Sequence, residues 1–293
     1  MKATTKALMA CSWMMAGGAA YALDFSAPVE KLAGDFKFTE GPVWSAAQSE
    51  LLFSDIPANR IVGFHNGKAT TFRTPSNNSN GLTMDQKARL IACEHGTRRV
   101  TRTEADGTIT VLAERYEGKR LNSPNDVVVR SDGAIYFTDP PYGVKADERE
   151  LDFQGVYRIS PDGKSLILLA RDFIKPNGLA FTPDEKTLFV NDTEGGHIRA
   201  FDIAPDGTLA NSRIFARTPS ADGMKVDTEG NVYCTSATGV MVFDRSGKHL
   251  GTFSMAEQPA NCAFGDADWK SLYMTSRTGL YRVRLAIPGI KVP

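Results

Sequence analysis

The sequence has few cysteines and histidines: its 293 residues include four of each. Three cysteines lie beyond residue 22, and the spacings of Cys93, Cys234 and Cys262 match no zinc motif. Export would permit a disulfide, but three cysteines leave at least one unpaired. We therefore expect all three to be small buried core residues.

Several common signatures are also absent. The chain has no G-x-S-x-G, so it lacks a serine-hydrolase elbow, and no G-x-G-x-x-G or P-loop that would indicate a nucleotide. It has no excess charge either, because 34 Lys and Arg balance 34 Asp and Glu. This balance gives no reason to expect a nucleic acid or an anionic membrane as partner.

Residues 1–22 have the pattern of a secretory signal peptide. A basic start, "MKATTK", precedes an apolar stretch, and "AYA" ends at Ala22 as a small-x-small cleavage site. A lipoprotein signal ending at Cys11 is the alternative, while the apolar run is too short for a membrane anchor. We predict a protein exported to the periplasm or secreted, with a mature charge of 32 minus 34, or −2, since residues 1–22 hold two lysines and no acids.

Six similar units follow one another along the chain. Each has a short apolar run, a polar turn with Asp or Gly, and further runs rich in Val, Ile, Phe and Tyr. The units begin at Gly41, Gly81, Asp126, Gly178, Gly223 and Cys262. Four strands in each unit of about 40–50 residues are typical of a propeller blade. We predict an all-β, six-bladed propeller over residues 23–293 as one domain.

The sixth unit ends soon after "LYRVRL" and lacks a fourth strand. A spare strand, "VEKLAGDF" at Val29–Phe36, stands at the other end of the chain. We expect it to pair with the sixth blade and close the circle of blades, because closure removes an exposed edge.

The residue before each innermost strand is an acid or an amide, and we call these six residues the ring. They are Glu40, Asn80, Asn125, Asn177, Asp222 and Asn261. Innermost strands of a propeller run parallel to the axis, so the ring should lie at one mouth of the channel. Asn and Asp also favour turns, but that explains Glu40 poorly. Converging carboxylates and amides require a cation or a proton, and oxygen ligands favour Ca²⁺, then Mg²⁺ or Mn²⁺, with Zn²⁺ less typical.

Four motifs in order, "TEGPVW", "NSPNDVVV", "PNGLAF" and "ADGMKVD", resemble the senescence marker protein/regucalcin/gluconolactonase family. The resemblance covers the mature chain and implies a six-bladed propeller with one divalent cation that hydrolyses sugar lactones. It assigns Glu40, Asn177 and Asp222 as metal ligands and Asn125 as a contact to metal or substrate. It also implies that Asp222 is the general base. Some animal members have an arginine where this chain has Ser123.

A lactone needs a polarised carbonyl and a deprotonated water, and a divalent cation with a carboxylate can provide both. Further residues near the mouth are candidates for substrate contact: His95, Arg120, Asn122, Asp139 and, beside them, Tyr142. Residues 142–155 are charged and non-periodic, so they form either a lid or an ordinary surface loop.

Three functions therefore compete. The first is a metal-dependent lactonase acting on a small-molecule sugar lactone. The second is an organophosphate or phosphotriester hydrolase on the same metal site. The third is a non-catalytic propeller that binds calcium.

Overall fold

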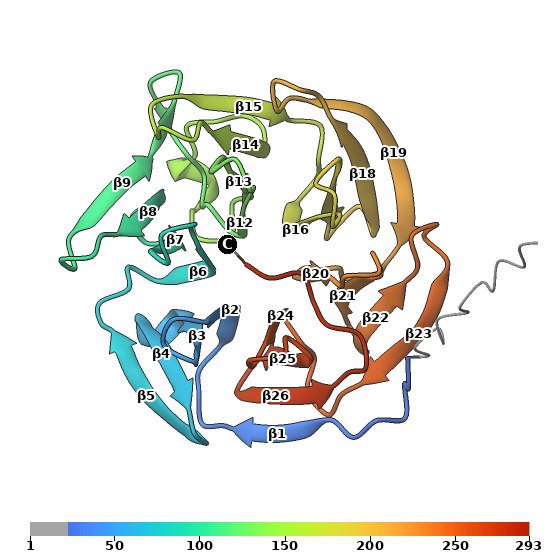
Figure 1. Cartoon of the computed structure of the whole chain (residues 1–293). Helices are drawn as coiled ribbons and strands as arrows, with labels where there is room; N and C mark the ends of the chain where they lie inside the picture. Colours follow the sequence, from blue (N-terminus) through green and yellow to red (C-terminus); the bar gives the residue numbers. More distant parts are fainter. Residues whose placement is uncertain (1–22, 293) are drawn as a thin grey trace, which may run out of the picture.

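Strand-forming runs and tight turns alternate along the chain, and they build six four-stranded antiparallel sheets around a central channel (Figure 1). The computed structural model describes residues 23–292, so the predicted signal peptide lies outside the described residues. The predicted six-bladed propeller is confirmed. Within the described part of the chain, no helix has the length and hydropathy needed to span a membrane.

The first three blades follow the chain from the innermost strand outward. Blade 1 contains β2 (Thr39–Ser45), β3 (Glu50–Asp55), β4 (Arg60–His65) and β5 (Lys68–Arg73). Blade 2 contains β6 (Ser79–Met84), β7 (Leu90–Glu94), β8 (Arg99–Thr103) and β9 (Ile109–Ala113). Blade 3 contains β12 (Val127–Val129), β13 (Ile135–Asp139), β14 (Gly155–Ile159) and β15 (Leu166–Ala170).

Blades 4 and 5 have the same order, whereas blade 6 takes its outermost strand from the N-terminal side of the chain. Blade 4 contains β16 (Pro176–Phe181), β17 (Thr187–Asp192), β18 (His197–Ile203) and β19 (Leu209–Arg217). Blade 5 contains β20 (Met224–Val226), β21 (Val232–Ser236), β22 (Gly239–Phe243) and β23 (His249–Ser254). Blade 6 contains β24 (Asn261–Gly265), β25 (Ser271–Ser276), β26 (Gly279–Arg284) and β1 (Glu30–Ala33).

Smaller elements connect the blades. A two-stranded hairpin, β10 (Arg115–Tyr116) with β11 (Lys119–Arg120), links blade 2 to blade 3. Two short 3₁₀ helices lie in loops, η1 (Ile56–Ala58) and η2 (Ala146–Glu148).

Closure by the N-terminal strand is confirmed, because β1 pairs antiparallel with β26. Glu30 lies opposite Arg282, and their side chains form an ion pair at 2.8 Å. The strand ends at Ala33, earlier than predicted, because Gly34 follows and Asp35 has a left-handed φ of 65°. Phe36 continues past the strand into the core, edge-on to Phe53 with ring centroids 5.1 Å apart.

The core lies between neighbouring blades. Large apolar side chains of one sheet pack against those of the next; Phe137 and Tyr157 of blade 3, for example, are buried with Ile91 of blade 2. The predicted burial of the cysteines is confirmed, since Cys93, Cys234 and Cys262 are fully buried and free. This sheet-to-sheet packing holds the innermost strands at fixed positions around the axis.

The C-terminal tail was not predicted to take part in the channel. Residues 285–292 leave blade 6 and run to the centre (Figure 1). There Ile290 N donates to Val226 O at 3.1 Å, and Gly289 N donates to Trp269 O at 2.8 Å. Val226 ends β20, while Asp222 stands before its start. The tail therefore crosses the channel at the end opposite the ring.

Candidate functional site

The six ring residues lie together at one mouth of the channel. Asn125 and Asp222 precede β12 and β20 as predicted, whereas the other four lie within the first two residues of their strands: Glu40, Asn80, Asn177 and Asn261. Five of them are almost fully buried, with side chains 2–5 % exposed: Glu40, Asn80, Asn125, Asn177 and Asn261. Asp222 is partly exposed. Polar side chains buried to this degree need partners.

Three neighbouring amides form a chain of hydrogen bonds. Asn80 Nδ2 donates to Asn125 Oδ1 at 2.6 Å, and Asn125 Nδ2 donates to Asn177 Oδ1 at 2.6 Å. His95 Nε2 lies 3.2 Å from Asn125 Oδ1. Burial lowers the pKa of His95 to about 4. A neutral imidazole therefore faces the amides at neutral pH.

The carboxyl groups of Glu40 and Asp222 have raised pKa values, because desolvation and neighbouring acids disfavour their negative charge. Burial, then the charges of Asp222 and Asp126, raise the pKa of Glu40 well above its usual range. Burial also raises the pKa of Asp222 to about 7, against a hydrogen bond from Asn177. The cluster therefore favours either protons or a bound cation.

Acidic residues at the ends of second strands hold the loops that carry three ring residues. Asp139 Oδ2 and Oδ1 accept from the backbone N–H groups of Asn122 and Ser123, each at 2.7 Å. Asp192 likewise accepts from Ile174 N and Lys175 N with one oxygen each, and Asp55 accepts from Lys37 N and Phe38 N with Oδ1 alone. Each anchored pair ends two residues before Glu40, Asn125 or Asn177.

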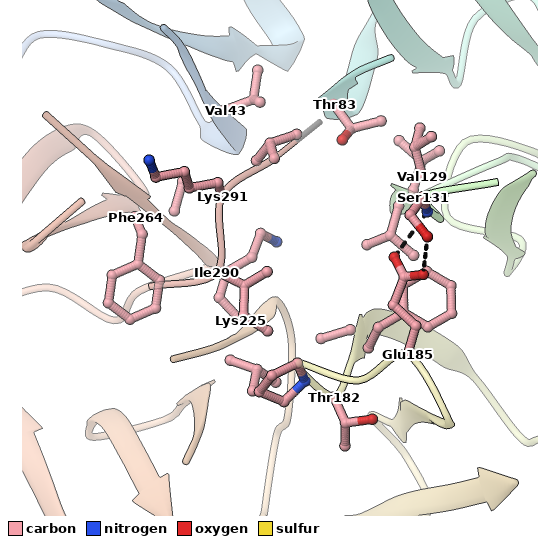
Figure 2. A pocket seen from close by; sticks show the side chains of 18 of the residues that line it. Val43, Thr83, Val129, Ser131, Thr182, Glu185, Lys225, Phe264, Ile290 and Lys291 are labelled. Carbon is pink, nitrogen blue, oxygen red and sulfur yellow. Dashed lines mark hydrogen bonds between the residues drawn. The ribbon is translucent and has the colours of Figure 1, made fainter. Parts of the chain in front are cut away.

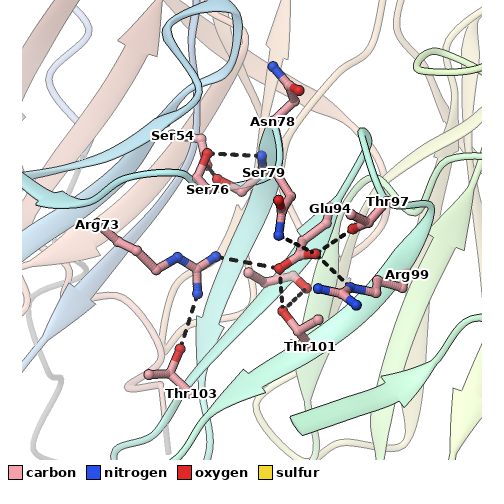
Figure 3. A network of polar contacts seen from close by, with 12 residues as sticks. Ser54, Arg73, Ser76, Asn78, Ser79, Glu94, Thr97, Arg99, Thr101 and Thr103 are labelled. Carbon is pink, nitrogen blue, oxygen red and sulfur yellow. Dashed lines mark hydrogen bonds and ion pairs between the residues drawn. The ribbon is translucent and has the colours of Figure 1, made fainter. Parts of the chain in front are cut away.

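Blade 2 uses the equivalent position differently. Glu94 ends β7 and accepts hydrogen bonds from side chains (Figure 3). In blades 1, 3 and 4 the equivalent acid accepts from backbone N–H groups of the loop before the ring residue. Arg99 Nε donates to Glu94 Oε2 at 2.8 Å, and Thr101 Oγ1 donates to Oε1 at 3.0 Å. His95 follows Glu94 directly, so this network fixes the point from which the imidazole enters the ring.

Hydrogen bonds between neighbouring blades hold the backbone of the ring residues in place. Thr138 Oγ1 of blade 3 donates to Asn177 O of blade 4 at 2.7 Å, and Ser54 Oγ of blade 1 donates to Asn80 O of blade 2 at 2.7 Å. Gly41 permits this close approach. It has a φ of 51°, and a Cβ there would lie 2.0 Å from Asn80 O. Its positive φ and this contact explain why glycine follows Glu40.

The residues predicted to contact substrate lie in different environments. His95 reaches the ring directly. Asp139 is buried, and both of its carboxylate oxygens accept hydrogen bonds from backbone N–H groups. Asn122 is buried too, and its Nδ2 donates to Asp139 O and Phe153 O at 3.1 and 2.9 Å. Arg120 lies on the β10–β11 hairpin, where its Nη2 donates to Thr97 O at 3.0 Å.

The loop after β13 brings Tyr142 over the ring. Asn177 Nδ2 donates to Tyr142 Oη at 3.3 Å, and Tyr142 Oη donates to Thr193 Oγ1 at 3.3 Å. Tyr142 is 45 % exposed overall, but partial desolvation of its hydroxyl raises its pKa to about 12, so the hydroxyl is protonated at neutral pH. Gly143 N donates to Ser123 Oγ at 2.9 Å. Ser123 thus holds the start of the 142–155 loop against the site.

Sequence reasoning missed two features of this site. Asp126 is 2 % exposed, and its Oδ2 accepts from Asn261 Nδ2 at 3.4 Å. Its only signal in the sequence is that an acid directly follows the ring residue Asn125. Arg277, between β25 and β26, is a cation whose charge lowers the pKa of Asp222. Nothing in its local sequence indicates that place.

The fold and the site define a propeller with a carboxylate–amide ring in its channel, and the comparisons place it more closely. A model of the SMP-30/Gluconolactonase/LRE-like region matches residues 38–278. The chain belongs to this family.

Relatives over most of the chain carry lactonase names. A gluconolactonase of Zymomonas mobilis is 33% identical, with 89% of this chain and 82% of that protein covered. The structure of a gluconolactonase of Xanthomonas campestris is 41% identical, with a TM-score of 0.83 over 88% of this chain and 90% of that one. A calcium-binding regucalcin of Agrobacterium tumefaciens shares the fold, with a TM-score of 0.79 at 18% identity over 91% of this chain and 97% of that one.

Proposed function

We propose that the protein is a divalent-cation-dependent hydrolase that opens sugar lactones. The observation that carries this proposal is the ring of two carboxylates, Glu40 buried and Asp222 partly exposed, with converging amides, in a chain 33% and 41% identical to two gluconolactonases.

The donor set fits a hard cation. Glu40 and Asp222 would supply two carboxylates, and Asn125 and Asn177 two amide oxygens. Asn80 Oδ1 is buried without a hydrogen-bond partner, which marks the ring as short of a cationic or hydrogen-bonding group. No group of three or more His, Cys, Asp or Glu residues within residues 23–292 is arranged to hold a metal. A site there would thus need amide oxygens, which suit Ca²⁺ first, and Mg²⁺ or Mn²⁺ before Zn²⁺.

When bound, the cation would polarise the lactone carbonyl and stabilise negative charge on its oxygen. Asp222 accepts the proton of the attacking water in this proposal, because it is a partly exposed carboxylate on the ring, beside the proposed cation. His95, which is neutral, and the Tyr142 hydroxyl are placed to orient substrate hydroxyl groups. The buried, bonded positions of Asp139 and Asn122 suit them to hold the site in shape.

Hydrolysis of organophosphates on the same ring, or calcium binding without catalysis, would use the same residues. The relatives favour lactones: a pentonolactonase of Haloferax volcanii, 28% identical, joins the gluconolactonases. Export is part of the proposal and rests on residues 1–22. An intact mass that begins at Leu23 in protein from native periplasm would support it, whereas a retained or lipidated N-terminus would contradict it.

The test combines three variants with a substrate panel. Asp222→Asn should retain metal and lose turnover by about 10²–10⁴-fold, because an amide ligates but accepts no proton. Glu40→Gln should lose metal affinity. Asn261→Ala, on the ring but outside the proposed ligands, should cost far less, because it removes hydrogen bonds to Asp126 and Glu40 but no proposed ligand. Metal content and hydrolysis of sugar lactones and phosphotriesters are measured with and without chelator. Lactone hydrolysis by metal-free wild type would refute the mechanism.

A further inference from the structure

The central channel holds a cavity at the end away from the ring. Its volume is about 400 Å³, and every innermost strand contributes to its wall. The strand residues on the wall include Val43, Leu82, Val127, Ala180, Val226 and Ala263. Ile290 and Val292 of the tail also line it, so this cavity lies between the blades and the tail (Figure 2).

A positive charge reaches into this apolar space. Figure 2 shows the Lys225 side chain extending from β20 into the volume that the strands enclose. Lys225 Nζ donates to Met224 O at 3.0 Å, the carbonyl of the preceding residue. An ammonium group has three N–H donors, so the group keeps donors for a ligand. Lys291 adds a second positive charge to the lining.

The acidic residue in the lining, Glu185, already accepts hydrogen bonds from the protein. Glu185 accepts from Ser131 N at 2.8 Å and also from the Ser131 hydroxyl. It lies at the polar edge of the cavity, with Ser131 and Thr182 (Figure 2). Glu185 also pairs with Arg130 at 3.8 Å, and Lys225 shares its charge with the buried Asp126, whose pKa burial raises and Lys225 lowers. The lining still has two positive side chains, Lys225 and Lys291, against one paired acid, and the surface around them is apolar. Such a site complements an anion with a hydrocarbon chain.

We propose that this cavity, at the end of the channel away from the ring, binds a medium-chain monocarboxylate. The carboxylate would pair with Lys225, and the chain would lie along Val43, Leu82 and Val127. A volume of about 400 Å³ lies within the range of small-molecule sites, which combine apolar walls with a few polar groups. Each methylene buried contributes about 0.8 kcal/mol, so affinity should rise roughly fourfold per added CH₂.

The test uses the full mature chain and decanoate as probe, with hexanoate and octanoate as the length series. Binding is measured by equilibrium dialysis, and decanol serves as the uncharged analogue. Lys225→Met should weaken decanoate binding at least tenfold, and Lys225→Arg should restore it. Lys164→Met, in the exposed turn between β14 and β15, is the matched control and should bind like wild type.

The ring is tested separately, because a carboxylate could also bind a metal there. Glu40→Gln should leave decanoate binding unchanged, whether or not the proposed lactonase activity survives. The proposal is overturned if decanoate fails to bind at millimolar concentration, or if Lys225→Met and Lys225→Arg both bind like wild type. Loss of binding in Glu40→Gln, or equal binding of decanol, would also overturn it. Circular dichroism of each variant confirms that the propeller remains folded.

Discussion

Asn261 Nδ2 of blade 6 donates to Asp126 Oδ2 of blade 3, across the channel, over 3.4 Å. The two residues are 2 % exposed and come from opposite sides of the circle of blades (Figure 1). Asn261 also hydrogen bonds to Glu40 and lowers its pKa. One amide thus links Asp126 to a proposed metal ligand. The candidate site therefore contains three acids. Glu40 and Asp222 belong to the ring, and Asp126 does not.

Replacing Asp126 tests whether this third acid attracts the cation. Asp126→Asn keeps the shape but removes a charge that raises the pKa values of both Glu40 and Asp222. Charges on the order of 10 Å apart interact by about 1.7 kcal/mol at an effective dielectric constant of 20. We expect divalent-cation affinity to fall by roughly tenfold or more, measured by competition with a chelating dye. Asp132→Asn, on the exposed turn of the same blade, is the control, and equal affinities in the two variants would exclude this role.

The pH dependence of metal binding follows from the raised pKa values. Asp222 has a pKa of about 7 and Glu40 a pKa well above its usual range. Both acids bind protons more readily than ordinary carboxyls, and a cation must displace these protons. Affinity should therefore increase with pH through the region around 7, and metal binding should release protons into a weakly buffered solution. Calorimetry in buffers of different ionisation enthalpy measures this release. A proton count of zero at pH 6 would be incompatible with the prediction.

The second-strand acids should stabilise the site through the backbone. Asp139→Asn leaves one oxygen where two N–H groups, of Asn122 and Ser123, each donate at 2.7 Å. An unsatisfied buried donor costs about 1–3 kcal/mol, so we expect a loss of that order in the free energy of unfolding, measured by urea denaturation. Cation affinity should fall as well, because the loop carries Asn125. Asp132→Asn is again the control. Unchanged stability in Asp139→Asn would show that the anchor is dispensable.

The blades and the ring could be predicted because both repeat: each unit places an acid or amide before an apolar strand, and closure brings equivalent positions together. Asp126 could not be found in this way. It occupies the position that is glycine after Glu40, Asn80, Asn177 and Asp222, and only the circular arrangement brings it to Asn261. The tail after Arg284 has no strand periodicity, and its role depends on contacts with Val226 and Trp269, far away in sequence. Long-range contacts of this kind leave no local pattern.

Closure of the propeller is tested by removing its spare strand. Deletion of residues 23–37 removes β1 and leaves the backbone of β26 without its outer partner, opposite Leu280, Tyr281 and Arg282. It also removes Phe36, which is 8 % exposed against Phe53. We expect strong destabilisation and aggregation, because an unpaired edge recruits other chains.

A synthetic peptide of residues 27–37 makes this test specific. Added in trans, it should pair with the edge of β26 and restore solubility and the thermal midpoint of the truncated protein, as strands added to a sheet edge do. The same peptide with Phe36→Ala is the matched control. It keeps the backbone pairing but loses the edge-on contact with Phe53, at a centroid separation of 5.1 Å. It should rescue less well, since truncating a buried Phe costs about 3–5 kcal/mol. A truncated protein as stable as the chain from Leu23 onward would argue against closure by β1.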